Sequence, residues 1–145
     1  MISLPTLLTL VHLIGLSLGV GAATVKVVLL FKCKSNSGLV RAYIKVVRPI
    51  TQVLISGIIL LTLSGIGWLF EGYPFTTELL IKIVLVAAIW ILGPIIDNVV
   101  EPKFKKLAPA ADHPVSSEFV KIMNQYFALE IFATALFYMI IIYWV

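Results

Sequence analysis

Four long apolar runs are the feature of this sequence that most constrains its fold. They cover approximately residues 4–31, 49–70, 78–100 and 118–144, and short polar segments separate them. A helix needs about 20 apolar residues to cross the hydrocarbon core of a bilayer. Within lipid, the backbone must also satisfy its own hydrogen bonds. The runs therefore predict an all-α fold, an integral membrane antiparallel four-helix bundle that forms one transmembrane domain over residues 1–145.

The composition argues against a soluble protein. Of the 145 residues, 61% are hydrophobic and only 12% are charged, which is too few charges to cover a surface in water. The net charge of +4 does not indicate nucleic-acid binding, because the cations lie in loops beside apolar runs rather than on a basic helix with interleaved aromatic residues. We therefore expect the lipid bilayer as a partner and no nucleic acid. The single cysteine, Cys33, excludes an intrachain disulfide and a cysteine metal cluster.

Turn and capping residues predict where the helices begin and end. Polar residues 32–38 should end the first helix, and residues 39–47 should form an interfacial turn of helix before Pro49 opens the second. Proline within the third run, at Gly93-Pro94, should kink that helix. The remaining boundary predictions are a cap at Thr76 or Thr77, an end at Glu101-Pro102, and a cap at Ser116 or Ser117.

The distribution of lysine and arginine predicts the orientation in the membrane. Eight cations lie in the first and third connections and a ninth, Lys121, lies at the start of the fourth run, whereas the second connection and both termini carry none. Cytoplasmic loops of membrane proteins are enriched in these residues, so we expect basic cytoplasmic loops with the N-terminus and C-terminus outside. The predicted location is a bacterial-type inner (plasma) membrane. An aromatic belt is expected at the opposite face, formed by Trp68, Tyr73, Tyr143 and Trp144.

The first apolar run is expected to be a retained helix rather than a signal peptide. Residues 1–5 carry no lysine or arginine, and the run is longer than the apolar region of a signal peptide.

Ionisable residues inside apolar runs are the best candidates for function, because each costs several kcal/mol unless it is paired or hydrated. Lys26 and Asp97 are expected within about two turns of the inner face, where they could form an ion pair. Alternatively, Lys26 could extend to the interface while Asp97 meets water. Glu130 is expected about 20 Å from either end of its helix, where a carboxyl group should be protonated, paired or hydrated. His12 is one possible partner for it, and Lys82 is the fifth such residue.

The first run carries a stripe of small residues, Gly15-x-x-x-Gly19-x-x-x-Ala23, on the same helical face as His12. Such a stripe is typical of close helix packing, either within the chain or between copies in a homo-oligomer formed through the first helix. A flat ligand lying against the glycines is the alternative, and His12 would then be its metal ligand. His113, in the polar loop, is expected to be solvated.

Three short motifs resemble those of a known superfamily. Residues 10–16, Leu-Val-His-Leu-Ile-Gly-Leu, with the following Gly19-x-Gly21, resemble the first helix of CopD-like small membrane proteins. Residues 63–67 resemble their second helix, and residues 79–86 resemble the opening of their third. The superfamily includes the HemJ-like protoporphyrinogen oxidases, in which a first-helix histidine and a third-helix lysine form the functional pair. The resemblance implies haem b binding and places those roles on His12 and Lys82.

Three functional hypotheses follow from these patterns. The first is a haem- or porphyrin-binding membrane oxidoreductase with His12 as the axial ligand, Lys82 pairing with propionates, and Gly15 and Gly19 against the ring. The second is a small proton-coupled transporter or permease in which Glu130 is the proton site and Lys26 and Asp97 form an inner gate. The third is a non-catalytic accessory or lipid-binding subunit. Lys82 and Glu130 are the predicted catalytic residues.

Overall fold

The computed structural model describes residues 3–109 and 115–142. The described residues are almost entirely helical and contain no strand. Four continuous helical segments are long and apolar enough to cross a membrane. Their elements are α1 (Leu4–Ser35), the 3₁₀-helix η1 (Ser37–Leu39), α2 (Val40–Phe70), α3 (Thr77–Ile95), the π-helix η2 (Ile96–Val100), α4 (Glu101–Leu107) and α5 (Ser117–Ile142).

The second helix begins nine residues earlier than the sequence predicted. The expected interfacial segment is part of α2, and Pro49 lies inside the helix rather than at its start. The reason is visible in packing: Val40, Tyr43 and Val47 recur at three- and four-residue steps, and all three are buried. Burial of this stripe extends the helix on the N-terminal side of the proline, and α1 likewise continues to Ser35 instead of ending near residue 31.

The prediction that Glu101-Pro102 ends the third helix is wrong. After Pro94 the helix changes into the π-helical turn η2 and then continues as α4 to Leu107. In the π register the Glu101 amide donates to the Ile96 carbonyl, five residues earlier, and the Asn98 side-chain amide donates to the Pro94 carbonyl at 3.0 Å. Pro102 lies in the first turn of α4, where a missing N–H is tolerated.

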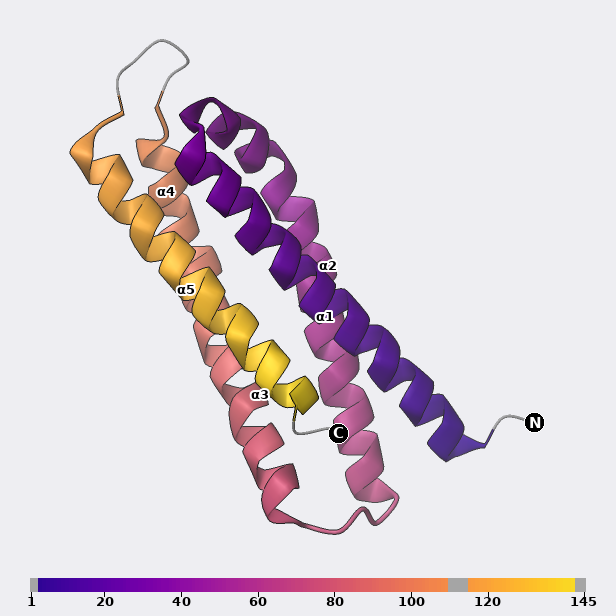
Figure 1. Cartoon of the computed structure of the whole chain (residues 1–145). Helices are drawn as coiled ribbons and strands as arrows, with labels where there is room; N and C mark the ends of the chain where they lie inside the picture. The colour runs from indigo at the N-terminus through magenta and orange to yellow at the C-terminus, as the bar shows by residue number, and fades with distance from the viewer. Residues whose placement is uncertain (1–2, 110–114, 143–145) are drawn as a thin grey trace.

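The helices run antiparallel, as Figure 1 shows. The beginning of α1 and the end of α5 lie at the same end of the bundle as the α2–α3 turn. The helix α1 packs against α2 and α5, and α5 also packs against α3, η2 and α4. By contrast, α2 and α3 make few direct contacts, although the Trp90 indole N–H donates to Thr62 Oγ1 at 3.0 Å.

The small-residue stripe forms the contact between α1 and α2. A Cβ atom built on Gly15 would lie 2.8 Å from the Leu61 amide nitrogen, and one built on Gly19 would lie 3.0 Å from the Phe137 ring. Gly57 of α2 would meet the backbone of Gly15 and Gly19 in the same way. The predicted close helix packing is therefore seen within the chain. Self-association through the first helix stays a prediction.

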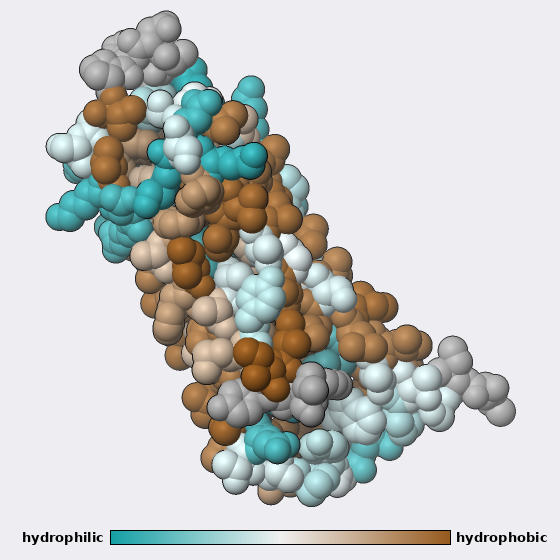
Figure 2. Space-filling view, in the orientation of Figure 1, coloured by the Kyte–Doolittle hydropathy of each residue, from teal (hydrophilic) through white to brown (hydrophobic). Residues whose placement is uncertain are grey.

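The surface has the character expected for a lipid-facing protein. Figure 2 shows hydrophobic residues over the middle of the visible face and hydrophilic residues toward its ends. Large apolar side chains such as Phe31, Phe70 and Ile91 are exposed. The predicted caps at Thr76 and Ser116 are confirmed, because their hydroxyl oxygens accept hydrogen bonds from the amides of Leu79 and Phe119.

Trp68 and Tyr73 of the predicted aromatic belt pack together at one end, with ring centroids 6.1 Å apart. Tyr143, Trp144 and His113 lie outside the described residues.

Candidate functional site

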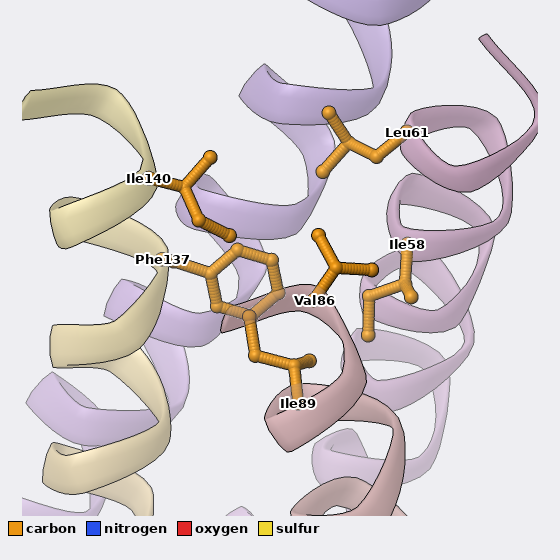
Figure 3. A pocket seen from close by; sticks show the side chains of 6 residues that line it. All are labelled: Ile58, Leu61, Val86, Ile89, Phe137 and Ile140. Carbon is orange, nitrogen blue, oxygen red and sulfur yellow. The ribbon is translucent and has the colours of Figure 1, made fainter. Parts of the chain in front are cut away.

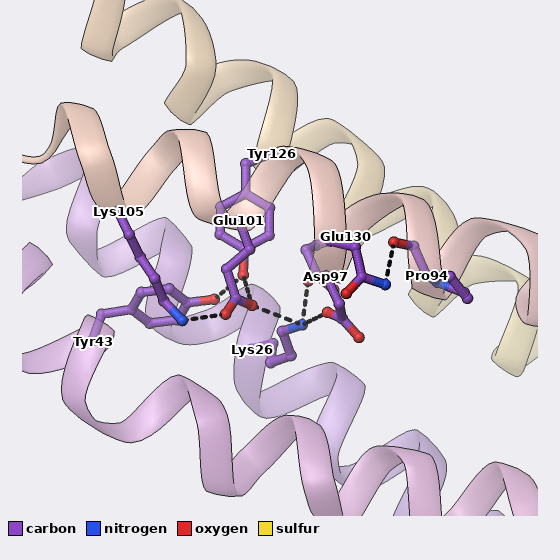
Figure 4. Close-up of polar contacts among 9 residues, drawn as sticks. Lys26, Tyr43, Pro94, Asp97, Glu101, Lys105, Tyr126 and Glu130 are labelled. Carbon is purple, nitrogen blue, oxygen red and sulfur yellow. Dashed lines mark hydrogen bonds and ion pairs between the residues drawn. The ribbon is translucent and has the colours of Figure 1, made fainter.

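A buried lysine surrounded by three carboxyl groups forms the centre of the candidate site. The Lys26 side chain is 2% exposed. Its Nζ lies 2.5 Å from Glu130 Oε1, 3.4 Å from Asp97 Oδ1 and 4.0 Å from Glu101 Oε2. Figure 4 shows these groups converging from α1, η2, α4 and α5. Of the two alternatives raised by the sequence, the ion pair between Lys26 and Asp97 is the one that the structure contains.

Two tyrosines and a second lysine extend this group into a polar network. The Tyr126 hydroxyl donates to Glu101 Oε2 at 3.0 Å, and the hydroxyls of Tyr126 and Tyr43 lie 2.8 Å apart. Lys105 Nζ donates to Glu101 Oε1 at 2.5 Å. Tyr43 belongs to α2, so all four membrane-length segments contribute to this network, which we call the Lys26 network: Lys26, Tyr43, Asp97, Glu101, Lys105, Tyr126 and Glu130.

Lys26 and Asp97 lie farther from the ends of their helices than the sequence predicted. Lys26 is nine residues from the end of α1 at Ser35, which corresponds to about 14 Å along the helix. Asp97 is ten residues from the end of α4 at Leu107, or about 15 Å. Both distances exceed the predicted ones because the helices continue past their predicted ends. Lys26 is enclosed by neighbouring helices and pairs with carboxylates.

The charges of the Lys26 network do not balance. It holds two ammonium groups, Lys26 and Lys105, and three carboxyl groups, those of Asp97, Glu101 and Glu130. Lys105 pairs with Glu101, and Lys26 lies closest to Glu130. Asp97 is therefore the carboxyl group whose charge is least compensated by a nearby ammonium group. Burying an uncompensated charge is costly, so the network favours binding one additional positive charge, either a proton or a cation.

A cleft opens beside the Lys26 network. Its volume is about 20 Å³, which is room for about one water molecule, and its lining includes Lys26, Asp97 and Glu130. Its remaining walls are apolar residues from all four segments, including Leu54, Gly93 and Phe137. A second, smaller cleft shares Ile58, Ile89 and Phe137 with the first and is lined only by apolar side chains, as Figure 3 shows. Both clefts therefore have room for water-sized molecules and for nothing larger.

The other predicted site residues lie elsewhere. His12 Nδ1 is 2.9 Å from Ser64 Oγ of α2, and the charge of Lys82 acts on His12 electrostatically. The structure therefore places the predicted His12 and Lys82 near each other. It does not join them to Glu130, whose ion-pair partner is Lys26.

The residues around His12 do not fit a haem placed as the sequence hypothesis required. Gly15 and Gly19 were expected to leave room for a flat ring, but the α2 backbone and the Phe137 ring fill the space beside them. The hydrogen bond between His12 and Ser64 also directs the imidazole toward α2. Among the described residues there is no group of three or more histidine, cysteine, aspartate or glutamate side chains that could hold a metal ion.

Sequence reasoning placed Tyr126 with Glu130 beside a hydrated inner cavity, but it missed Tyr43, Glu101 and Lys105 as members of the site. Glu101 was taken as the end of the third helix and Lys105 was assigned to the polar loop after it, because Pro102 was taken as a helix end. Their four-residue spacing, which continues from Asp97, is the signal that could have placed all three on one helical face. Tyr126 and Glu130 have the same spacing on α5.

Comparison with known protein families, with characterised proteins and with solved structures found no match for this chain. The resemblance to the CopD-like and HemJ-like proteins therefore rests on its short motifs alone. The function has to be argued from the Lys26 network and its cleft.

Proposed function

We propose that this chain is a small proton-coupled membrane transporter in which the Lys26 network takes up and releases the coupling proton. The observation that carries the proposal is the surplus carboxyl group. Three carboxyl groups, of which Glu101 and Glu130 are buried and Asp97 is partly buried, share two ammonium groups, so one bound proton makes the network neutral. Buried acidic residues that pair with cations mark proton relays in membrane transporters.

Protonation would change which helices the network holds together. Lys26 of α1 now bridges to Glu130 of α5 and to Asp97 of η2. A proton on either carboxyl group weakens one of these ion pairs, because a neutral acid attracts an ammonium less strongly than a carboxylate does. The occupancy of the site is thereby linked to the packing of α1 against the other helices. The π-helical turn η2 is a suitable place for rearrangement, since such turns are frequent at functional sites.

The polar route from the Lys26 network runs toward one end of the bundle. It leads through Glu101 to Lys105, whose side chain is 35% exposed. In the other direction lies the second cleft, whose lining residues are apolar and include Leu61, Phe137 and Ile140. The structure thus supports a conformation in which protons exchange with the end that carries the basic residues. We assign that end to the cytoplasm of a bacterial-type inner membrane, with both termini outside.

Proton flux into liposomes tests this proposal. The purified protein would be reconstituted with an internal pH-sensitive dye, and a potassium diffusion potential would drive protons inward. We expect a flux that depends on the protein and that falls by at least about tenfold in Glu130→Gln, which keeps the shape of the side chain but removes its proton site. Glu118→Gln is the matched control, because Glu118 is an exposed acid in the first turn of α5.

An equal flux in Glu130→Gln and the unchanged protein would refute the proposal, provided that both fold alike by circular dichroism. The proposal would also be refuted if no preparation showed proton flux, either with or without an added solute. The accessory-subunit hypothesis would then be favoured.

A further inference from the structure

The cleft beside the Lys26 network indicates how a proton reaches the most buried carboxyl group of the site. We propose that the cleft binds one water molecule, which hydrogen-bonds to Asp97 and Glu130 and relays a proton between them. This inference rests on the proposed function and adds the path that the coupling proton takes within the site. It follows from the volume of the cleft, the polar atoms that line it and the distance between the two carboxyl groups.

The cleft has the size and the lining that a buried water requires. Its volume is about 20 Å³, and a cavity of about 10–15 Å³ can hold one water if two to four polar groups bond to it. Lys26, Asp97 and Glu130 supply three such groups. The second cleft has about 10 Å³ and is lined by apolar side chains alone, and apolar cavities stay dry. We therefore expect a water in the first cleft and none in the second.

The groups around the cleft have hydrogen-bonding capacity that the protein itself does not use. Glu130 Oε1 lies against the Lys26 ammonium, yet this buried oxygen accepts no hydrogen bond from the described residues. The ammonium carries three N–H donors. One of them donates to Asp97 Oδ1 at 3.4 Å, and Glu101 Oε2, at 4.0 Å, is too far away to accept another. A water in the cleft can therefore donate to Glu130 and accept from Lys26.

The two carboxyl groups are close enough for one water to bridge them. Glu130 Oε1 and Asp97 Oδ1 lie 2.5 and 3.4 Å from the same atom, Lys26 Nζ, and dashed lines mark both contacts in Figure 4. The two oxygens are therefore at most about 6 Å apart, and two O–H···O hydrogen bonds in series span about 5–6 Å. A water that accepts from Lys26 keeps both of its own O–H groups for the two carboxyl groups.

The relay lets an accessible acid serve a buried one. The Asp97 side chain is 23% exposed, whereas that of Glu130 is 3% exposed. The proton of a protonated Asp97 passes to the water oxygen, while one of the water's own protons bonds to the Glu130 carboxylate. The water is restored, Asp97 becomes a carboxylate and Glu130 becomes a neutral acid. The ion pair that joins α1 to α5, between Lys26 and Glu130, is then weakened.

Infrared difference spectroscopy tests for the water itself. Spectra of the reconstituted full chain would be recorded as the difference between an acidic and an alkaline sample, in ordinary water and in water labelled with oxygen-18. We expect an O–H stretching band that shifts with the oxygen isotope, because a bound water changes its hydrogen bonds when Glu130 is protonated. A carboxylic acid C=O band should appear in the same spectra and should be absent from those of Glu130→Gln.

A cleft-filling variant tests whether the water carries the proton. Ala133 lines the cleft one turn from Glu130, and Ala133→Val adds two methyl groups there without removing an ionisable group. We expect the isotope-sensitive band to disappear and the proton flux in liposomes to fall by at least about tenfold, since the relay is lost. Ala135→Val is the matched control, because Ala135 is exposed on the same helix and valine restricts the helix equally there. The control should change neither readout.

The outcomes separate this inference from the proposed function. Proton flux from the unchanged protein without any isotope-sensitive band would overturn the water relay and leave the proton site standing. Unaltered flux in an Ala133→Val protein that has lost the band would also overturn the relay, as would equal flux and equal bands in Ala133→Val and Ala135→Val. An isotope-sensitive band without any flux would support the water between the carboxyl groups and refute the proposed transport.

Discussion

Lys26 is the cation that compensates the charges of its two neighbours, Glu130 and Asp97. If Lys26 is replaced by Met, Glu130 and Asp97 lose their shared cation while they remain within the bundle. Removing one partner of a buried ion pair typically costs about 3–5 kcal/mol because the remaining charge is uncompensated. We therefore expect Lys26→Met to lower the free energy of unfolding in detergent by about that amount. Chemical denaturation followed by circular dichroism would measure it.

The double variant Lys26→Met/Glu130→Met tests whether the uncompensated charge of Glu130 causes this destabilisation. It removes one cation and one acid, so the surplus of one carboxyl group is unchanged and the loss should be smaller than in Lys26→Met alone. Lys32→Met, at an exposed position on the same helix, should change stability by no more than about 0.5 kcal/mol. A double variant at least as unstable as the sum of its two single variants would contradict the ion-pair explanation.

At the scale of elements, the contact between α1 and α2 depends on glycine. A Cβ atom on Gly57 would lie 2.8 Å from the Gly15 carbonyl oxygen and 2.9 Å from Gly19 Cα. These are backbone atoms, so the helices themselves would have to separate. We expect Gly57→Ala to destabilise the protein by about 1–3 kcal/mol, measured as a lower thermal unfolding midpoint in detergent.

Gly65→Ala is the matched substitution on the same helix. A Cβ atom on Gly65 meets nothing within 4 Å, and alanine is the better helix former by about 1 kcal/mol. Its unfolding midpoint should therefore be unchanged or raised. Equal losses in the two variants would contradict the close approach of α1 as the cause of the loss in Gly57→Ala.

The elements also show what the sequence could and could not predict. The four runs and the caps at Thr76 and Ser116 depend on local composition, and the structure reproduces them. The misplaced boundaries lie at Pro49 and Pro102, where local rules favour a helix end. There the outcome depends on tertiary packing of the Val40–Val47 face and on the π-helical turn before Glu101.

The same dependence explains why the site was only partly predicted. Lys26, Asp97 and Glu130 stand out in sequence because each interrupts an apolar run. Glu101 and the two tyrosines do not, since Glu101 lies beside Pro102 and tyrosine is common at membrane interfaces. Whether Glu130 pairs with Lys26 or with His12 depends on how α1 and α5 pack against each other. The residue periodicity of a single helix carries no information about that packing.

For the whole molecule, the clustering of cations at one end is the feature that governs orientation. The nine flanking lysine and arginine residues lie at one end of the bundle, where α1 passes into α2 and where α4 and α5 meet. Residues 71–77, at the other end, include no lysine or arginine. Cations close to membrane segments are retained on the cytoplasmic side. Residue 37, in η1, should therefore face the cytoplasm, and residue 71, after α2, should face outward.

Cysteine labelling in a Cys33→Ala background measures this orientation directly. Ser37→Cys and Glu71→Cys both replace exposed residues, and neither removes a lysine or arginine. In intact bacterial cells, a membrane-impermeant maleimide should label Glu71→Cys at once and Ser37→Cys only after lysis. The reverse pattern would place the exposed end of the polar route, at Lys105, on the outer face. Protons would then enter the Lys26 network from outside, and the direction of the proposed proton-coupled transport would be inverted.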